Sequence, residues 1–341
     1  MTDSSSLETF LSSLCVRTDD HHCSVDQAPL EPAENMIAPL THYGFILTEG
    51  PDSTTFLQGQ TTCNLKEITA EQSRPGALCT AKGRMVSSFL LAAVGEQRYL
   101  LRTRADLVES TKAALGKYIV FSKATQADYS CTYLAVGLRG PRAAANIEAA
   151  FGSIPTTQYQ QVSADTGIAI RLDGQADLYE CWIPADRLST VWPILSTGLE
   201  LQGSKSWELL TVRQGLGEVC AATADEFIPQ MLNYQATGAI SFNKGCYTGQ
   251  EVVARMQYKG TMKRRLFHIR IEGAESTPNA PLFRPGSEQS IGNIVNAVEL
   301  PDGATEALAV ITISDAEQGT VLAGTNLSTV QVLSLPYAIT N

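Results

Sequence analysis

The sequence predicts an α+β protein with more than one domain, and two stretches of the chain support that prediction. Residues 131–203 follow the order strand, helix, strand, strand, helix, strand, which is the order of a ferredoxin-like unit. Residues 263–341 contain successive strands without a long helix between them, which indicates a small β-barrel or β-sandwich. The length of 341 residues suffices for two or three domains of about 100 to 200 residues each.

The N-terminal stretch, residues 1–28, differs from the rest of the chain. Its apolar residues fall at helical spacing and predict a short helix: Leu7, Phe10, Leu11 and Leu14. The polar residues that follow have no periodic pattern, so we expect a flexible lead-in. His21-His22-Cys23 lies in this lead-in, but the sequence offers no second cluster of ligands, so no metal site is predicted.

Residues 40–130 alternate between strand and helix signals. Tyr43-Gly44-Phe45-Ile46-Leu47 is typical of a strand, and Pro51-Asp52 begins a short helix that reaches Gly59. Turn residues then separate apolar runs at 77–81, 85–94 and 99–102, which predicts a series of hairpins. A helix over 105–118 completes this part.

The later elements are shorter and regularly spaced. In the ferredoxin-like stretch, helices begin at Pro141 and Ala185, and strands are expected at 132–138, 168–172, 179–183 and 199–201. A helix from about 205 to 214 follows, with Trp207 and Leu210 facing a core. The C-terminal strands are expected at 266–271, 291–298, 308–314 and 330–335.

The composition describes a globular, acidic chain. Hydrophobic residues make up 44%, charged residues only 18%, and the net charge is −10. Such a chain repels nucleic acid and anionic membranes unless its positive charge is locally concentrated. No apolar run approaches the roughly 20 residues that a membrane helix needs, and the N-terminus does not resemble a secretory signal.

The eight cysteines are spread along the chain and form no C-x-x-C pair. This spacing argues against a structural zinc site or the ligand run of an iron–sulfur cluster within this chain. Their number is also too small, for this length, to make a disulfide scaffold. Reduced thiols in a cytosol-like compartment explain them most simply, so a cytoplasmic protein is predicted.

The most informative stretch is Lys244-Gly245-Cys246-Tyr247-Thr248-Gly249-Gln250-Glu251. Thr248 and Glu251 have the spacing of a capping box, so a helix is expected to begin there. Cys246 then lies just before a helix N-terminus, and Lys244 is two residues away. Both features lower the pKa of a thiol. Two interpretations stay open: a reactive thiol, or a buried cysteine that packs as a small hydrophobic residue.

Positive charge is concentrated around this stretch. Seven basic residues and one acid, Glu251, lie between Phe227 and Ile271, a local charge of +6. We call the segment 244–270 the basic island. It predicts a site for a polyanion such as phosphates, nucleic acid or a polyglutamate tail. The alternative is a solvated basic edge of the β-module.

Five blocks of residues, taken in order, resemble the YgfZ-type folate-binding proteins, which are relatives of the glycine-cleavage T-protein (aminomethyltransferase). The octapeptide at 244–251 is the most specific of the five. The others are Phe56-Leu57-Gln58-Gly59-Gln60-Thr61-Thr62, Ala81-Lys82-Gly83-Arg84, Lys117-Tyr118-Ile119-Val120-Phe121-Ser122-Lys123 and Phe227-Ile228-Pro229-Gln230. The resemblance extends from about Ala38 to the C-terminus.

The resemblance implies a three-domain, T-protein-like ring whose central hole binds tetrahydrofolate or a derivative. Residues 1–28 would be a flexible extension. Residues 29–130 together with 204–262 would form a discontinuous folate-binding domain. A ferredoxin-like middle domain (131–203) and a C-terminal β-barrel (263–341) complete the expected architecture.

The resemblance also assigns site residues. Two aromatic positions associated with folate fall on Trp207 and Tyr43; the better-known bacterial members have Trp at the second, so weakened binding is expected. Arg255 and Lys259 suit the glutamate carboxylates. Tyr247 and Gln250 are the other expected folate-binding residues. The expected functional thiol is Cys246, assisted by Lys244, and no metal site is expected.

Two departures from the T-protein argue against aminomethyl transfer. Its acidic pterin-region residue corresponds to Gln214 here, which carries no charge. Its catalytic aspartate lies in an Asn/Asp/Gly-rich loop, where this chain has Thr61-Thr62-Cys63-Asn64. Aminomethyl transfer needs a carboxylate to steer the amine and its developing charge.

The function implied by the resemblance is therefore a folate-binding accessory protein. It would support the assembly or repair of iron–sulfur clusters in enzymes that modify tRNA, with those enzymes or their assembly factors as partners. One rival is a folate-dependent one-carbon transferase or demethylase. The other is a non-catalytic module that contacts tRNA weakly, or a partner protein, through the basic island.

Overall fold

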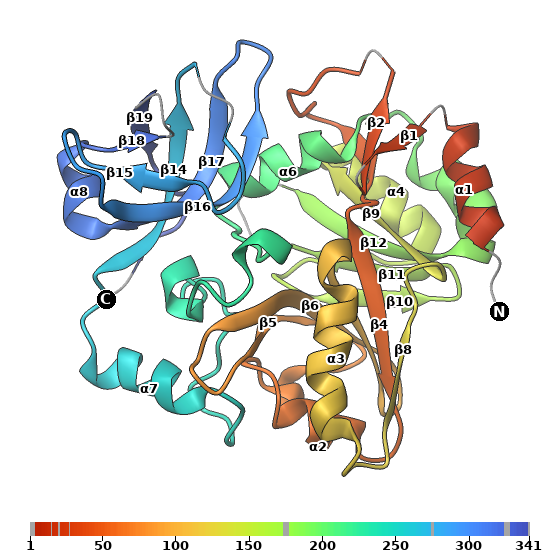
Figure 1. Ribbon diagram of the computed structural model, residues 1–341. Helices are drawn as coiled ribbons and strands as arrows, with labels where there is room; N and C mark the ends of the chain where they lie inside the picture. Colours follow the sequence, from red (N-terminus) through yellow and green to blue (C-terminus); the bar gives the residue numbers. More distant parts are fainter. Residues whose placement is uncertain are drawn as a thin grey trace. The chain divides into compact units, whose positions relative to one another are not determined.

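The computed structural model describes residues 4–14, 16–19, 21–26, 28–172, 177–273, 276–323 and 328–339 (Figure 1). The chain divides into two compact units. Unit 1 comprises Met1–Gln58, Asn64–Pro75 and Phe89–Trp207, and unit 2 comprises Gly59–Cys63, Gly76–Ser88 and Glu208–Asn341. The α+β class is confirmed. The boundaries of the three expected domains and their arrangement as a ring stay predictions.

The larger sheet of unit 1 has six strands in the order β10-β11-β12-β9-β3-β13. Its strands are β3 (Met36–Pro39), β9 (Tyr133–Arg139), β10 (Gln161–Ala164), β11 (Gly167–Arg171), β12 (Leu178–Pro184) and β13 (Glu200–Leu201). Helices α4 (Pro141–Phe151) and α5 (Leu188–Leu195) contribute Ile147 and Leu195 to a core shared with Val136 and Leu138 of β9. The elements of the expected ferredoxin-like order are present, with β10 as an additional strand between α4 and β11 that was not predicted.

Strand β3 changes how that sheet is completed. In a ferredoxin-like unit the last strand would pair with the first, but here β13 pairs in parallel with β3, and β3 pairs antiparallel with β9. All four residues of β3 are buried. A four-residue apolar stretch far from the other strands in sequence gives little signal, so its place in the sheet could not be predicted.

The second sheet of unit 1 is antiparallel, with neighbouring strands β6, β7, β4 and β8. They are β4 (Tyr43–Glu49), β6 (Met85–Gly95), β7 (Arg98–Arg104) and β8 (Thr125–Asp128). Helix α3 (Val108–Ile119) contacts β4 and β8, and α2 (Ser53–Gln58) follows β4. Short helical turns η1 (Leu65–Glu67), η2 (Ala105–Leu107) and η3 (Ala185–Arg187) also belong to this unit.

The N-terminal residues form helix α1 (Ser4–Ser13) and a hairpin of β1 (Val16–Asp19) and β2 (His22–Val25). The helix agrees with the apolar spacing, whereas the hairpin lies where the sequence showed no pattern. Only Cys23 of β2 is deeply buried, so the strand lacks the alternation that identifies strands. The Cys23 thiol donates a hydrogen bond to the Pro39 carbonyl (2.8 Å).

Unit 2 contains the C-terminal β-barrel, drawn in blue in Figure 1. Within the described residues it closes in the order β14-β17-β16-β15-β18-β19, which settles the choice between barrel and sandwich. Its elements are β14 (Arg264–Ile271), β15 (Pro281–Phe283), β16 (Ser290–Glu299), β17 (Thr305–Thr312), α8 (Ile313–Gln318), β18 (Leu322–Ala323) and β19 (Ser328–Leu333). Ile269, Ile294 and Ala309 lie in its core.

The rest of unit 2 is built from short elements. It includes most of strand β5 (Arg74–Cys79) and the first residues of β6, since unit 2 contains Gly76–Ser88. Helix α6 (Ser204–Arg213) leads into η4 (Ala221–Thr223), η5 (Pro229–Leu232) and helix α7 (Gln250–Lys259). Among the described helices, none has the length and hydropathy that a membrane span requires.

Candidate functional site

Tyr43, the first expected folate residue, lies at the start of β4 and is buried. The Arg102 guanidinium carbon lies 3.9 Å from the centre of its ring, at the distance of a cation–π contact. The His42 ring lies 4.1 Å away, tilted by 43°. The tyrosine ring is therefore already packed between side chains of unit 1.

Arg102 is held in that position by a buried ion pair. Its Nε donates to Glu180 Oε1 (2.9 Å) and its second terminal nitrogen to Oε2 (3.2 Å). Glu180 is completely buried and also accepts a hydrogen bond from the Trp182 indole nitrogen (2.6 Å). Hydrogen bonds from both sides are what a buried carboxylate needs to stay charged. This ion pair beside Tyr43 was not predicted from the sequence. Glu180, a charged residue inside an apolar strand, could have indicated it.

Trp207, the second expected folate residue, lies on α6 and is also completely buried. Its ring packs against Gly137 of β9, where an added Cβ would come within 2.3 Å of Cε3. Only glycine permits this approach. The indole N–H has no hydrogen-bond partner within the described part of the chain. Tyr43 and Trp207 therefore both belong to unit 1, but neither presents an exposed ring face.

The octapeptide at 244–251 lies in unit 2, in the turn that leads into α7. The helix begins at Gln250, after Gly249 in the left-handed region (φ 86°). The predicted capping box of Thr248 and Glu251 is therefore wrong. The Thr248 hydroxyl instead donates to Gln60 Oε1 (3.3 Å), and Gln250 Oε1 accepts a hydrogen bond from the Tyr247 amide (3.1 Å).

Two glycines allow the loop at 80–84 to approach this turn closely. A Cβ on Gly249 would lie 2.4 Å from the Thr80 carbonyl oxygen, and one on Gly83 would lie 2.8 Å from Val252 Cβ. Phe227 accepts a backbone hydrogen bond from Met85, and Gln230 Nε2 donates to the Val253 carbonyl (2.6 Å). In this way, unit 2 brings together residues from four of the five sequence blocks.

Lys244 is anchored by backbone groups. Its Nζ donates to the carbonyl oxygens of Thr61 (2.5 Å) and Cys63 (2.6 Å) and lies 5.0 Å from the centre of the Tyr247 ring. Burial lowers the pKa of this ammonium to about 8. The ammonium thus holds the segment 61–63 to the octapeptide. Among the described residues, its side chain makes no hydrogen bond to Cys246.

Cys246 is exposed and lies four residues before the first residue of α7. The interpretation as a buried hydrophobic residue therefore does not describe it; reactivity stays a prediction. Cys131 is the other exposed thiol among the described cysteines. Burial raises the pKa of Cys79 to about 12 and raises that of Cys181 strongly. Cys15 lies outside the described residues.

The other expected residues differ in exposure. Tyr247 is buried, and burial raises the pKa of its hydroxyl. Arg255 and Lys259 are exposed on α7, and neither forms an ion pair within the described ranges. In the part of the chain that is described, no group of three or more His, Cys, Asp or Glu side chains could hold a metal ion.

Comparison with known proteins identifies the family. The "tRNA-modifying protein YgfZ" of Serratia proteamaculans (strain 568) is 31% identical over 329 residues, covering 91% of this chain and 96% of the relative. That of Cronobacter sakazakii is 32% identical over 331 residues, covering 91% and 97%. The chain belongs to the YgfZ family.

Two further comparisons agree with this membership. Residues 34–197 match the GCVT N-terminal domain family. The crystal structure of glycine cleavage system aminomethyltransferase T from Bartonella henselae superposes with a TM-score of 0.75 at 17% identity, covering 97% of this chain and 96% of that one. At this identity the likeness shows the fold alone, and it confirms the T-protein-like class expected for a YgfZ protein.

In this YgfZ chain, residues 61–63 make structural contacts within unit 2. Thr62 accepts a backbone hydrogen bond at its hydroxyl from Ala77 (2.8 Å) and donates to the Ala239 carbonyl (2.7 Å). The carbonyls of its neighbours Thr61 and Cys63 hold Lys244. Residues 61–63 contain no carboxylate, and their polar groups are occupied within unit 2.

Proposed function

We propose that this YgfZ-family protein binds tetrahydrofolate or a derivative and acts as an accessory factor in tRNA modification. It would do so by supporting the assembly or repair of iron–sulfur clusters in the modifying enzymes. The observation that carries the tRNA part is the family membership, because the relatives named tRNA-modifying proteins match 91% of the chain. The iron–sulfur part rests on the sequence resemblance.

Folate binding draws support from the GCVT domain match and from the geometry of Trp207. An unpaired, buried N–H costs about 1–3 kcal/mol, and a ligand carbonyl or carboxylate that accepts from it removes that cost. The Trp207 indole N–H is such a group. Tyr43 supplies an aromatic ring for the folate, and its position is fixed by the cation–π contact with Arg102.

Aminomethyl transfer is not part of the proposal. The residues that correspond to the T-protein catalytic loop contribute carbonyl oxygens to Lys244 rather than a carboxylate to a substrate. Chemistry is assigned instead to the exposed Cys246 thiol. Since one thiol cannot hold a cluster, Cys246 would act as a transient, shared ligand or as a protecting thiol at a partner's cluster.

Calorimetric titration with folinic acid in reducing buffer tests the folate proposal. We expect saturable binding by the wild type, loss of binding in Trp207→Ala, and partial binding in Trp207→Phe, which keeps a ring but lacks the N–H. Trp192→Ala is the matched control, because Trp192 is a nearly buried tryptophan on α5 that packs against Phe10. Absence of binding by the wild type, or equal binding by Trp207→Ala, would overturn the proposal.

A second candidate function is weak contact with tRNA through α7. Tyr258 on this helix is 69% exposed and lies between residues whose side chains are also exposed, including Arg255 and Lys259. Cations that neutralise phosphates next to an aromatic ring that stacks on a base are a common arrangement in RNA-binding surfaces.

A further inference from the structure

Exposed apolar side chains concentrate in the sequence block 117–123, where helix α3 ends. Of the six large apolar residues that are exposed in the described part of the chain, three lie within four consecutive positions: Tyr118 (45% exposed), Val120 (72%) and Phe121 (87%). We call these three residues the apolar patch. Single exposed apolar residues are common on protein surfaces, but a cluster of them is typical of a site of contact with another molecule. The patch belongs to unit 1 alone.

The turn that carries the apolar patch is held in a defined conformation. The Phe121 amide donates to the Tyr118 carbonyl (3.3 Å). Lys123 and Asp52 then exchange two hydrogen bonds: the Lys123 amide donates to Asp52 Oδ2 (2.7 Å), and the Asp52 amide donates to the Lys123 carbonyl (3.3 Å). Because the turn is already constrained, little conformational entropy is lost when a partner covers its apolar side chains.

The turn leads directly into β8, which is an edge strand of the second sheet of unit 1 (Figure 1). Three of the four residues of β8 are exposed. The Tyr129 amide donates to the Phe45 carbonyl of β4 (2.8 Å), and backbone groups alternate in direction along an antiparallel strand. The amides and carbonyls of Gln126 and Asp128 therefore point away from β4, and they form no hydrogen bond within the described ranges. Such a row of open backbone groups can pair with another extended chain.

Positive charge flanks the apolar patch. Residues 110–127 contain three lysines and no acid, although the chain as a whole carries a net charge of −10. Lys112 is paired with Glu109 (2.9 Å), whereas Lys117 and Lys123, on either side of the patch, are exposed and form no ion pair with any described residue. Their charges favour a partner that carries carboxylates next to its apolar side chains.

Two acids border this surface, and backbone amides engage both carboxylates. Asp52 accepts from the Lys123 amide, and Asp128 Oδ1 accepts from the Ser130 amide (2.8 Å). The ammonium groups of Lys117 and Lys123 are therefore the charges beside the patch that stay available to a partner.

We propose that this end of unit 1 docks an extended, acidic segment of a partner protein, which pairs with β8 as an added strand. Backbone groups of the segment take up the open hydrogen bonds of Gln126 and Asp128, and its apolar side chains cover the apolar patch. Its carboxylates meet Lys117 and Lys123. The surface uses none of the residues assigned to folate or to the functional thiol, so it does not depend on either assignment.

Two other occupants fit the same surface less well. RNA binds through phosphates and stacked bases, but Val120 has no ring for a base to stack on, and a base does not pair with a row of strand amides and carbonyls. A second copy of this chain would form a symmetric interface that brings the lysines of both copies together.

Selection from a phage-displayed library of random dodecapeptides, with the full-length protein as bait, tests the chemistry of the partner. We expect enrichment of sequences in which Asp or Glu lies next to apolar residues. Proline should be rare among them, because it lacks the N–H that an added strand donates. A selection that enriches nothing, or that enriches neutral or basic sequences, overturns the proposal.

Substitutions locate the binding of the most enriched peptide, which is measured by fluorescence anisotropy. Phe121→Ala removes a side chain that is 87% exposed, so the fold should be kept. We expect at least about tenfold weaker binding, the effect of losing an aromatic anchor. Lys117→Glu/Lys123→Glu should also weaken it, and salt should weaken binding by the wild type. Ile194→Ala is the matched control, because Ile194 is an exposed apolar residue of unit 1 on α5. Wild-type affinity in Phe121→Ala excludes the patch.

Hydrogen exchange distinguishes an added strand from contact with side chains alone. When the peptide saturates the protein, exchange of the Gln126 and Asp128 amides should slow, because both amides then donate to the peptide backbone. Unchanged exchange of these two amides in the saturated complex rules out the added strand and with it the proposal.

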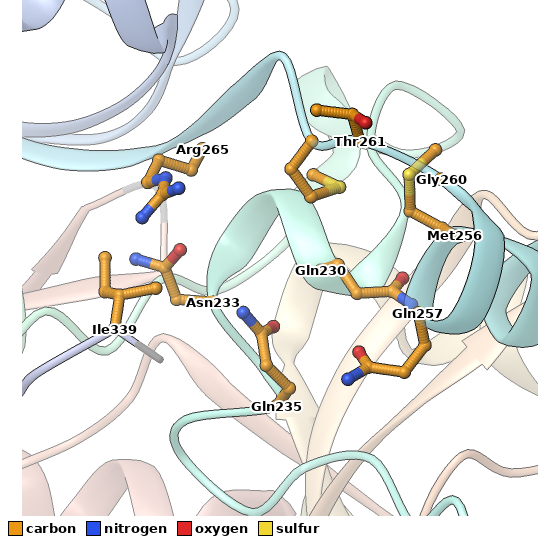
Figure 2. Close-up of a pocket in the computed structure, with 10 residues that line it drawn as sticks. Gln230, Asn233, Gln235, Met256, Gln257, Gly260, Thr261, Arg265 and Ile339 are labelled. Carbon is orange, nitrogen blue, oxygen red and sulfur yellow. The ribbon is translucent and has the colours of Figure 1, made fainter. Parts of the chain in front are cut away.

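Two further results would assign the surface to another occupant and so overturn the proposal. The first is tRNA binding that Phe121→Ala weakens and Tyr258→Ala does not. Tyr258 lies on α7, whose Met256 and Gln257 line a cavity of about 330 Å³ in unit 2 (Figure 2). The second is a wild-type dimer in analytical ultracentrifugation that Phe121→Ala dissociates. We expect neither.

Discussion

The Glu306 carboxylate accepts two hydrogen bonds from the Arg213 guanidinium, at 2.8 and 3.0 Å. This contact joins the end of α6 to strand β17 within unit 2. His268 Nε2 lies 3.2 Å from the same carboxylate. Burial alone would raise the pKa of Glu306, but the hydrogen bonds from His268 and Arg213 outweigh it and lower the pKa to about 2.

The first prediction concerns acid stability. Because the folded state lowers the pKa of Glu306, the carboxylate stabilises the protein above pH about 4.5, and the contribution is lost as the pH falls towards 2. The lowered pKa corresponds to a contribution of about 3 kcal/mol to the free energy of unfolding at neutral pH. Urea unfolding of wild type and Glu306→Gln at pH 7 and pH 3 measures it. We expect the variant to be less stable at pH 7 and the difference to shrink at pH 3; a constant difference would contradict the assignment.

The second prediction concerns the buried ion pair in unit 1. Arg102→Met leaves the completely buried Glu180 carboxylate without its cation, which we expect to lower the free energy of unfolding by about 3–5 kcal/mol. The double variant Arg102→Met/Glu180→Met removes both charges and should recover most of the loss. Urea denaturation of the four proteins gives the coupling energy. Additive effects would show that the two charges do not depend on each other.

The third prediction uses two glycines of the octapeptide. Gly249→Ala places a Cβ at positive φ and 2.4 Å from the Thr80 carbonyl oxygen, so we expect a loss of at least about 1–2 kcal/mol. Gly245→Ala is the control, because a Cβ there meets nothing within 4 Å. Thermal unfolding should separate the two variants clearly. Equal melting temperatures would show that the turn before α7 is not constrained as described.

The fourth prediction concerns thiol reactivity. Native protein treated briefly with iodoacetamide should be modified at Cys246 and Cys131, whereas the buried Cys79 and Cys181 should react only after unfolding. Mass mapping of the modified peptides, with Cys246→Ser and Cys131→Ser as controls, identifies the sites.

In a folate-dependent turnover assay, full activity of Cys246→Ser would favour the one-carbon transferase over the thiol-centred function.

The fifth prediction concerns RNA. Binding through α7 should weaken steeply with salt, and Arg255→Glu/Lys259→Glu should weaken it further and reduce the magnitude of the log–log slope by about 2. Lys66→Glu is the control, since Lys66 is exposed on η1 in unit 1. Filter binding with tRNA over a range of salt measures the slope. Salt-independent affinity would remove this candidate function.

Much of the fold could be predicted because its signals are local. The elements between 131 and 203 and the strands after 263 carry regular apolar patterns and turn residues, and the structure contains them. The T-protein-like class followed from the five blocks rather than from these patterns. Strand β3 and the N-terminal hairpin could not be predicted, because each is short and is stabilised by partners distant in sequence.

The candidate site was predicted less completely, for a different reason. The sequence pointed to Tyr43 and Trp207 but not to the groups that fix them, Arg102, Glu180 and Gly137. Those contacts depend on which strands are neighbours, and spacing along one segment does not contain that information. The helix start was misplaced for a related reason, since Gly249 has a positive φ and lies close to the loop at 80–84, a neighbour distant in sequence.

The insertion of β3 between β9 and β13 has a consequence for how unit 1 folds. Among the described strands, β13 pairs only with β3, which lies far earlier in the chain, so the sheet is completed only after a large loop has closed. High contact order of this kind slows folding. A fragment of residues 131–203 alone would leave the edge of β9 unpaired, and an unpaired edge is a template for aggregation.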